Sequence, residues 1–226
     1  MNILITGAGR GIGYQCVKQL AATSTYNIIA VSRNIAALEA LALPNVQVVS
    51  ADITQAENMA SLVSTLVGRY GKIDVLINNA GLLVNKPFTD FSIDDARRIF
   101  EVNFFAPAQL IQALTPHINR GGHVLNIGSM GGYQGSQKFP GLAYYSSSKG
   151  AIAILTECLA EELKDSGIRV NCVALGSVQT EMLQEAFPGY QSPTTAEEMA
   201  HFIVDFALRS GALFNGKVIP VSVATP

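Results

Sequence analysis

The chain has 226 residues, of which 49% are hydrophobic and 14% are charged, and its formal net charge at pH 7 is -2. This composition supplies enough apolar side chains for a large core in which parallel strands are buried on both faces. The small net charge and the lack of a basic cluster argue against a nucleic acid or an anionic membrane surface as partner.

The start of the chain and its cysteines bear on where the protein works. The first expected strand begins at residue 2, which leaves no room for a signal peptide, and no apolar run reaches about 18 residues. The three cysteines, Cys16, Cys158 and Cys172, are odd in number and widely spaced, so neither a disulfide framework nor a zinc site is indicated. We therefore expect buried thiols in a metal-free cytoplasmic protein, with residues 1–226 forming one domain.

The first thirteen residues read MNILITGAGRGIG and combine a short apolar strand with a glycine-rich turn. Glycines at positions 7, 9, 11 and 13 let backbone N–H groups approach a phosphate without a Cβ in the way. The turn also delivers an anion to the N-terminus of the following helix, where free amides and the helix dipole favour negative charge. A strand, a glycine turn and a helix at the start of an α/β pattern favour dinucleotide binding over an ordinary strand-to-helix loop.

Strands and helices are expected to alternate along the whole chain. Strands are expected at residues 2–5, 27–32, 46–50, 72–77, 122–128, 168–174 and 217–222. Helices are expected at residues 12–22, 35–41, 54–70, 92–118, 143–165 and 194–209. Thr54 and Glu57 have capping-box spacing at the start of the third helix, and an interruption of the fourth is expected near Pro107. The alternation predicts an α/β fold of Rossmann type, a doubly wound parallel sheet of about seven strands with helices on both faces.

The end of the second expected strand bears on cofactor choice. In the common dinucleotide fold, an acid about twenty residues after the glycines accepts a hydrogen bond from the ribose 2′-OH of NAD. Here residues 31–34 read VSRN, and no acid occurs before Glu39. Arg33 can pair with a 2′-phosphate, Ser32 can donate to it, and Arg10 in the turn is placed to help. We prefer NADP(H) over NAD(H), the alternative being that Arg33 is a solvated residue at a helix start.

Two further stretches follow expected strands and therefore lie at the ligand-binding edge. The carboxylate of Asp52 can accept a hydrogen bond from an adenine amino group, and it is free to do so if Thr54 caps the next helix. Residues 78–81 read NNAG, in which Ala80 and Gly81 allow close backbone approach to a cofactor. Asn78 is expected to tie neighbouring strands together rather than touch a ligand.

Residues 145–149, which read YSSSK, are expected to carry the chemistry. Residues four apart share a helix face, so the hydroxyl of Tyr145 and the ammonium of Lys149 point into one site. An ammonium within about 4–6 Å lowers the pKa of an acid by roughly 1–3 units, which would bring Tyr145 nearer neutrality. Ser146 and Lys149 also match a β-lactamase-type nucleophile motif, but the accompanying Ser-Asp-Asn and Lys-Thr-Gly are absent.

This ordered set of motifs resembles the short-chain dehydrogenase/reductase family of the classical type. The motifs are TGxxxGxG at residues 6–13, NNAG at 78–81, a serine at 129, YxxxK at 145–149, and residues 171–180, which follow NxVxPGxxxT. The resemblance extends over residues 2 to about 222. Three departures stand out: Leu175 replaces the usual proline, the segment before Tyr145 is a few residues longer, and the chain ends in VSVATP rather than near Asp-Gly-Gly.

The resemblance implies a role for each matching residue. Tyr145 gives or takes the alcohol proton, Lys149 tunes it and donates to the nicotinamide ribose, and Ser129 orients the carbonyl. Asn103 breaks a helix and holds a water that connects the lysine to solvent, and the hydroxyl of Thr180 meets the nicotinamide carboxamide. The residues expected to bind the cofactor are Gly7, Gly9, Arg10, Gly11, Ile12, Gly13, Ser32, Arg33, Asp52, Ile53, Asn79, Ala80, Gly81, Tyr145, Lys149, Gly176, Val178 and Thr180.

The sequence therefore predicts an NADP(H)-dependent enzyme that reversibly reduces a carbonyl compound to an alcohol. Its small-molecule substrate is expected to be uncharged or bulky, because the expected pocket wall is mostly apolar or aromatic: Leu82, Leu83, Met130, Tyr133, Phe139, Leu183, Phe187 and Tyr190. Residues 180–194 would form a small lid over this pocket. His117, His123 and His201 fit no site pattern and are expected to be structural.

Two alternatives remain open. A 3-oxoacyl-carrier-protein reductase would need a basic patch for its carrier, and the available Arg97, Arg98 and Lys138 are scattered. A sensor or scaffold that binds NADP without turnover would have no need of the serine, tyrosine and lysine set. The helices over residues 94–118 and 143–165 have more apolar residues than one buried face requires, so a homodimer or homotetramer is expected.

Overall fold

The computed structural model describes residues 1–223 and contains a seven-stranded, all-parallel sheet in the order β3-β2-β1-β4-β5-β6-β7. The order reverses between β1 and β4, and in such sheets ligands bind in the crevice at the carboxyl ends of the strands beside this point. The strands are β1 (Asn2–Thr6), β2 (Asn27–Ser32), β3 (Val46–Ser50), β4 (Ile73–Asn78), β5 (Ile118–Ser129), β6 (Arg169–Leu175) and β7 (Val218–Val221). The predicted doubly wound sheet is confirmed.

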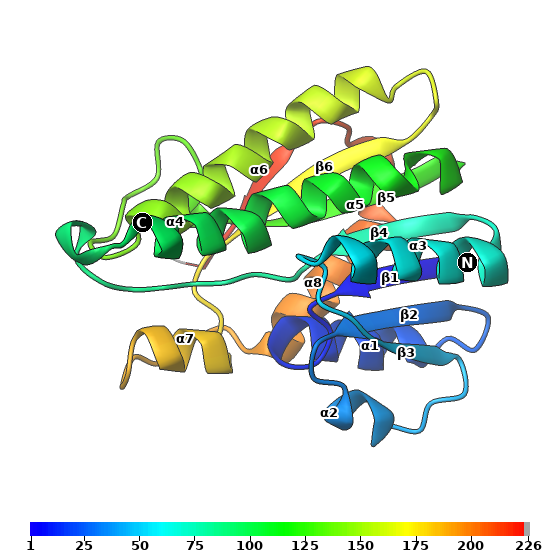
Figure 1. Ribbon diagram of the computed structural model, residues 1–226, viewed down its shortest axis with the longest axis horizontal. Coiled ribbons are helices and arrows are strands. Elements are labelled where there is room, and N and C mark those ends of the chain that lie inside the picture. Colours follow the sequence, from blue (N-terminus) through cyan, green and yellow to red (C-terminus); the bar gives the residue numbers. More distant parts are fainter. Residues whose placement is uncertain (224–226) are drawn as a thin grey trace.

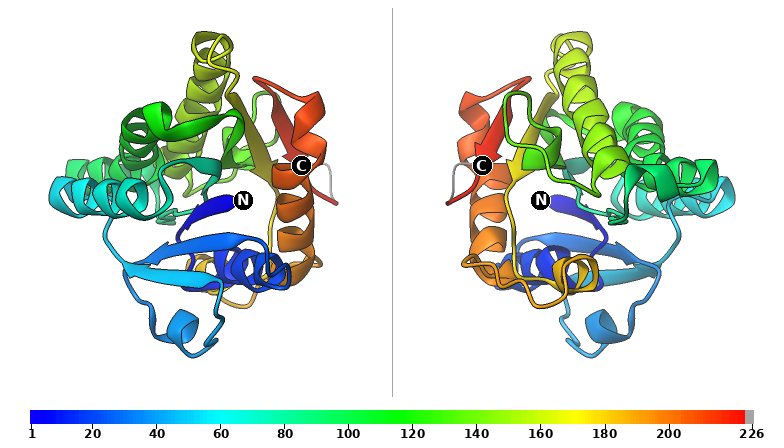
Figure 2. Two further views of the ribbon diagram at one scale, coloured as in Figure 1. Left: turned by 90° about the vertical axis from the view of Figure 1, so that its right-hand side faces the viewer. Right: turned by 90° about the vertical axis from the view of Figure 1, so that its left-hand side faces the viewer.

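Helices cover both faces of the sheet (Figures 1 and 2). They are α1 (Gly11–Ala21), α2 (Ala36–Glu39), α3 (Ala56–Tyr70), α4 (Ile93–Phe100), α5 (Ala106–Leu114), α6 (Ala143–Glu162), α7 (Glu181–Ala186) and α8 (Ala196–Leu208). Helices α1 and α8 contribute to one apolar cluster, and α3, α5 and α6 contribute to another on the opposite face. Within residues 1–223, no helix is both long and apolar enough to cross a bilayer.

The alternation of side chains along β1 shows how the sheet separates these two clusters. Ile3 and Ile5 pack with Val17 and Leu20 of α1 on one face, whereas Leu4 belongs to the cluster on the other face. All five side chains are almost fully buried. Burying a side chain of this size contributes about 1.5–3 kcal/mol each, so the sheet is stabilised from both sides.

The long helical region expected over residues 92–118 is interrupted just before Pro107, as predicted. A π-helical turn, Glu101–Phe105, separates α4 from α5, and Asn103 lies buried at its centre. Pro107 lies in the first turn of α5, directly after this π-helical turn, and it has no N–H to donate to a carbonyl of the turn before it. The predicted interruption near Pro107 is therefore found as a π-helical turn that ends at Phe105.

The capping box predicted at Thr54 was wrong. Helix α3 begins at Ala56 with Gln55 as N-cap, and no side chain caps it. The backbone N–H and the hydroxyl of Thr54 both donate to Oδ1 of Asp52, at 3.0 and 2.8 Å. An acid two residues earlier thus engages Thr54 in a local turn, as Asp side chains commonly do.

Other expectations about local structure need smaller corrections. The helix expected over residues 35–41 is only the four residues of α2, and the sequence pattern missed α7 entirely. Cys16 and Cys172 are buried free thiols as expected, but Cys158 on α6 is exposed. The last expected strand is confirmed as β7, and residues 224–226 lie outside the described part of the chain.

Candidate active site

A cavity of about 720 Å³ opens at the carboxyl edge of the sheet, beside the point where the strand order reverses. It brings together residues from the glycine turn, the ends of β2, β4, β5 and β6, and the helices α6 and α7. Of the sequence-predicted site residues, Gly13 and Asn103 lie behind the wall. The others line the cavity: Gly7, Gly9, Arg10, Gly11, Ile12, Ser32, Arg33, Asp52, Ile53, Asn79, Ala80, Gly81, Ser129, Tyr145, Lys149, Gly176, Val178 and Thr180.

The glycine turn is held against the end of β4 by contacts that leave no room for side chains. Gly7 has a φ of +66°, and a Cβ there would lie 2.6 Å from Cα of Ala80. A Cβ on Gly13 would lie 2.4 Å from the carbonyl oxygen of Gly7 and 2.5 Å from Nδ2 of Asn79. The Asn79 amide donates to the carbonyls of Thr6 and Gly7 at 3.1 and 3.0 Å. Gly13 and Asn79 therefore fix the shape of the turn.

This turn delivers the N-terminus of α1 to the cavity. Arg10 is the N-cap residue and makes no side-chain cap, while Gly11 and Ile12 of the first turn line the cavity. The first amides of a helix have no intrahelical partner and favour a negative charge. A glycine cradle that a Cβ would fill, next to the N-terminus of an eleven-residue helix, fits the pyrophosphate of a dinucleotide.

The three residues expected to carry the chemistry come together at the other side of the cavity. Tyr145 lies in the first turn of α6 and Ser129 is the last residue of β5; both line the cavity, and Ser129 is the side chain that acts to lower the pKa of the Tyr145 hydroxyl against the effect of burial. The Ser129 hydroxyl also accepts a hydrogen bond from the N–H of Gly131 at 3.1 Å. Lys149 is 5% exposed, and its ammonium donates to the carbonyl of Ile127 at 2.7 Å.

The electrostatics of this group differ from the sequence-based expectation. Burial raises the pKa of Tyr145, and Ser129 opposes this rise only in part. Burial lowers the pKa of Lys149 to about 8. The expectation that Lys149 would bring the pKa of Tyr145 toward neutrality was therefore wrong, because desolvation of the phenolate dominates. The carbonyl of Ile127 holds the ammonium in place.

Asn103 lies behind the cavity wall and links three segments around the lysine. Its Oδ1 accepts from the N–H of Leu82 at 2.7 Å, and its Nδ2 donates to the carbonyl of Leu82 and to the hydroxyl of Ser148, both at 2.9 Å. The Ser148 hydroxyl in turn donates to the carbonyl of Tyr145 at 2.7 Å. The predicted interruption of the helix by Asn103 is confirmed as the π-helical turn.

Several predicted residues line the cavity but are already engaged in local structure. Asp52 accepts the two hydrogen bonds from Thr54 described above, so the expectation that a Thr54 cap would leave it free was wrong. Thr180 is the N-cap of α7, and its hydroxyl accepts from the N–H of Leu183 at 3.3 Å. Gly176 packs against Ser222, whose Oγ would lie 2.5 Å from an added Cβ.

The expected pocket wall is largely found. Leu82 and Tyr133 do not line the cavity, and the backbone of Leu82 is instead bonded on both sides to Asn103. The expected residues that do line it are Leu83, Met130, Phe139, Leu183, Phe187 and Tyr190. Sequence reasoning did not single out Val102, Gln137, Ser177, Glu181 and Met182, although Ser177 lies in the motif of residues 171–180 and the last two lie in the expected lid over residues 180–194.

Buried polar groups behind the site have structural roles. Asn78 donates to Asn126 on the neighbouring strand at 2.9 Å, which confirms its predicted role in joining strands. His123 is 1% exposed, with Nδ1 2.9 Å from the carbonyl of Ala207 and Nε2 3.0 Å from Nδ2 of Asn171. Burial lowers the pKa of His123 to about 4, so the ring is neutral and structural, as expected.

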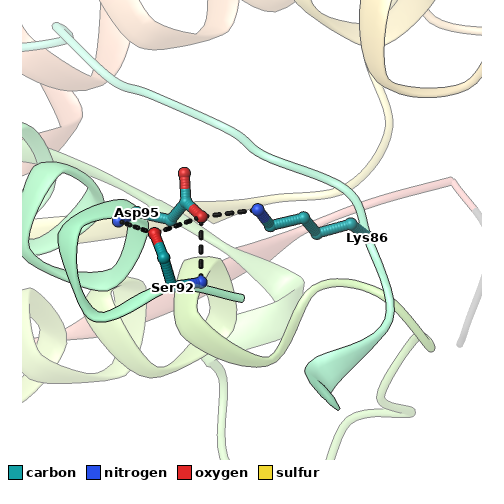
Figure 3. Close-up of polar contacts among 3 residues, drawn as sticks. All are labelled: Lys86, Ser92 and Asp95. Carbon is teal, nitrogen blue, oxygen red and sulfur yellow. Dashed lines mark hydrogen bonds and ion pairs between the residues drawn. The ribbon is translucent and has the colours of Figure 1, made fainter. Parts of the chain in front are cut away.

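The connection between β4 and α4 is fixed beside the cavity by a charged cluster, shown in Figure 3. The carboxylate of Asp95 accepts from Lys86 at 2.5 Å, and it also accepts from the N–H and the hydroxyl of Ser92 in a capping box. These donors hold the pKa of Asp95 well below its ordinary value. One residue earlier, Asn85 donates to the carbonyl of Ala186 at the end of α7, at 2.8 Å.

Comparison with known proteins gives a consistent family. A sequence model described as short chain dehydrogenase matches residues 1–191. An uncharacterised oxidoreductase of Staphylococcus epidermidis is 28% identical over 206 residues, which cover 89% of this chain and 88% of that protein.

Solved structures resemble the whole fold. A 4-hydroxyisoleucine dehydrogenase mutant complexed with NADH and succinate superposes with a TM-score of 0.88 and 25% identity, covering 98% of this chain and 96% of that one. ElxO with NADP bound gives a TM-score of 0.84 and 27% identity, covering 97% and 96%. The neighbours therefore include structures with either nicotinamide cofactor.

Proposed function

Because the chain belongs to the short-chain dehydrogenase family, we propose that it is an NADP(H)-dependent oxidoreductase that interconverts a carbonyl compound and an alcohol. The observation that carries this proposal is the position of Ser129, Tyr145 and Lys149 in one cavity with the glycine turn. A protein that only bound a dinucleotide would have no need of this buried set. When bound, the nicotinamide would supply or accept the hydride.

In the proposed reduction, Tyr145 gives a proton to the oxygen of the carbonyl group as it becomes an alcohol. Its raised pKa keeps the hydroxyl protonated at neutral pH, which is the form that reduction requires. Ser129, which lines the cavity together with Tyr145, is the second group that can donate to the same oxygen and fix its position.

Lys149 and Asn103 act behind the tyrosine in this proposal. The ammonium of Lys149 is buried and held by the carbonyl of Ile127, and in this proposal it donates to the hydroxyls of the nicotinamide ribose. Asn103 holds Leu82 and Ser148 in place around it, and the proton path through a water at Asn103 remains a prediction.

The preference for NADP(H) is supported by the residues at the end of β2. Ser32 and Arg33 line the cavity next to the glycine turn, and a Cβ on Gly9 would lie 2.5 Å from Oγ of Ser32. A cationic and a hydroxyl donor at this place suit a 2′-phosphate, and no carboxylate from β2 opposes it.

The substrate is proposed to be an uncharged small molecule. Part of the cavity wall is apolar and is formed by Leu83, Met130, Phe139 and Phe187. The charged side chains that line the cavity are Arg10, Arg33, Asp52, Lys149 and Glu181, and none of them belongs to this apolar wall. This wall suits a bulky apolar carbonyl compound better than a charged one.

A carrier-protein substrate receives less support. Two of the three basic residues weighed for such a docking patch are already paired, since Lys138 donates to the carbonyl of Tyr133 and to Ser136, and Arg97 pairs with Asp94.

We also propose that the protein self-associates, because Phe105 and Ile154 are large apolar side chains that are 47% and 60% exposed. Elution of a 24.0 kDa monomer in gel filtration would contradict self-association.

Substitution Tyr145→Phe tests the proposed function. We expect turnover of NADPH with a panel of ketones, aldehydes, quinones and acyl thioesters to fall by about 10²–10⁴-fold, with NADPH affinity retained. The matched control is Tyr144→Phe, since Tyr144 packs on Phe88 and Phe91 and does not line the cavity. Retained turnover in Tyr145→Phe would refute the assignment, and tight NADPH binding without turnover in the wild type would favour a sensor.

A further inference from the structure

An ion pair joins the glycine turn to α7, and its arginine, Arg10, lines the cavity. Nη1 of Arg10 lies 2.5 Å from Oε1 of Glu185, and Nη2 lies 3.2 Å from Oε2, so both ends of the guanidinium face both carboxylate oxygens. The two residues are 175 positions apart in the sequence. Figure 1 shows α7 projecting beyond the carboxyl edge of the sheet, at the end where α1 begins.

Helix α7 is therefore attached on two sides. The pair with Arg10 ties it to the cofactor side, and the hydrogen bond from Asn85 to the carbonyl of Ala186 ties it to the β4–α4 connection. Glu181 and Leu183 of the same helix line the cavity. Loss of the ion pair at Arg10 would therefore loosen α7, a helix that lines part of the cavity.

Arg10 is also placed to meet a 2′-phosphate. It follows Gly9, which packs against Ser32, and it lines the cavity together with Ser32 and Arg33. The same two terminal nitrogens that form the pair with Glu185 are the ones that bind a phosphate in the forked geometry. Arg10 cannot make both bidentate contacts at once.

Negative charge from α7 surrounds this arginine. Besides Glu185, Glu181 lies close to the turn, with Oε2 3.5 Å from the position of a Cβ on Gly11. Both carboxylates raise the pKa of Arg10. A phosphate that approaches Arg10 therefore has to displace the carboxylate of Glu185, and it is also repelled by the negative charge of both carboxylates.

We propose that Glu185 is a cofactor-specificity residue that competes with the 2′-phosphate of NADP(H) for Arg10. Binding of NADP(H) breaks the ion pair and frees this attachment of α7, whereas binding of NAD(H) leaves it in place. The inference rests on the proposed function, because it requires that the cavity holds a nicotinamide dinucleotide.

The exchange is physically reasonable because the two pairs differ in strength. The Arg10 and Glu185 side chains are 53% and 62% exposed, and exposed ion pairs contribute little. A phosphate has more charge than a carboxylate and more acceptor oxygens, so its bonds with a guanidinium are stronger. Glu185 thus reduces the affinity for NADP(H) without preventing binding.

The test measures the dissociation constants of NADPH and NADH by titration calorimetry for the wild type and variants. In Glu185→Gln we expect NADPH to bind about two- to fivefold more tightly and NADH to change by less than about 1.5-fold. In Arg10→Gln we expect weaker NADPH binding, and adding Glu185→Gln to it should then change NADPH affinity by less than Glu185→Gln does in the wild type. The matched control is Glu162→Gln on α6, which removes the same charge from an exposed residue outside the cavity.

Each contrary result has a defined meaning. Equal changes of the NADPH and NADH dissociation constants in Glu185→Gln would overturn the proposal. Glu185 would then only hold α7 in place through its ion pair with Arg10. An unchanged NADPH affinity in Arg10→Gln would also overturn the proposal, because Arg33 rather than Arg10 would then bind the 2′-phosphate. Failure of the wild type to bind either cofactor would contradict the proposed function instead, and is visible before any variant is made.

Hydrogen exchange of the α7 amides provides a second readout. We expect these amides to exchange faster in the NADPH complex than in the NADH complex of the wild type, and equally in the two complexes of Glu185→Gln. Equal exchange in the wild-type complexes would overturn the release of α7.

Discussion

The two sides of the cavity are built from different kinds of contact. On the cofactor side, the backbone of the glycine turn packs against the backbone of Ala80. The side-chain amide of Asn79, directly after β4, donates to two carbonyls of the turn. On the substrate side, the six-residue α7 is attached through exposed side chains, chiefly Glu185 and Asn85. The first side has little freedom to change shape, whereas the second can move when a single polar contact is exchanged.

Gly13→Ala should have the largest effect on this comparison. The new Cβ would lie 2.4 Å from the carbonyl oxygen of Gly7, which is backbone and cannot give way. We expect a loss of at least about 3 kcal/mol in the free energy of unfolding, together with loss of cofactor binding. Urea unfolding and NADPH titration measure the two effects.

The control for this substitution is Gly68→Ala in α3, where an added Cβ meets nothing within 4 Å. It should stabilise the helix by about 0.5–1 kcal/mol and leave NADPH binding unchanged. Normal cofactor binding in Gly13→Ala would show that the turn is more adaptable than its contacts indicate.

Lowering the pH should reduce the free energy of unfolding through His123, a buried residue behind the cavity. The pKa of His123 is about 4 in the folded protein against an ordinary 6.5, so between these values the unfolded chain binds a proton that the folded protein does not. The free energy of unfolding should therefore fall as the pH decreases from about 6.5 to 4, by at most about 3 kcal/mol from this group.

Unfolding in urea at a series of pH values measures this effect. His123→Gln should flatten the dependence in this window, while His201→Gln, which changes an exposed histidine on α8, should leave it as in the wild type. An unaltered pH dependence in His123→Gln would assign the loss of stability to other groups.

The smallest predicted effect separates the two sides most directly. Asn85→Ala removes one hydrogen bond to α7, worth about 1 kcal/mol, so we expect KM for the carbonyl substrate to rise about fivefold and the dissociation constant of NADPH to stay unchanged. Steady-state kinetics and titration measure the two quantities.

Asn45→Ala is the matched control, because Asn45 also donates to backbone carbonyls, those of Ala21 and Thr23, but lies outside the cavity. It should leave KM unchanged. An equal change of KM and of NADPH affinity in Asn85→Ala would mean that the two sides of the cavity are mechanically one unit.

The same contrast explains how far sequence reasoning reached. The glycine turn, residues 78–81 and the Tyr145–Lys149 pair are readable because their function depends on spacing within a few residues. The strand positions are readable for a similar reason, since buried parallel strands are continuous apolar runs.

Other features depend on competition or on distance along the chain. Thr54 matches a capping box, but nearby Asp52 engages its hydroxyl, and the local pattern does not reveal which contact prevails. The pair of Arg10 with Glu185 joins residues 175 positions apart on a helix too short to show amphipathic periodicity. The pKa of Tyr145 depends on how deeply the finished fold buries it, which no spacing predicts.

The π-helical turn at Glu101–Phe105 has a consequence for everything that follows it. Each residue of an α-helix advances about 100° around the axis, so one additional residue in a wide turn rotates the rest of the helix by that angle. Leu110, Ile111 and Leu114 of α5 are buried in the apolar cluster with this rotation in place. The chain thus places the amide of Asn103 where it bonds to Leu82 and Ser148, and the wide turn still leaves the apolar side chains of α5 facing the sheet.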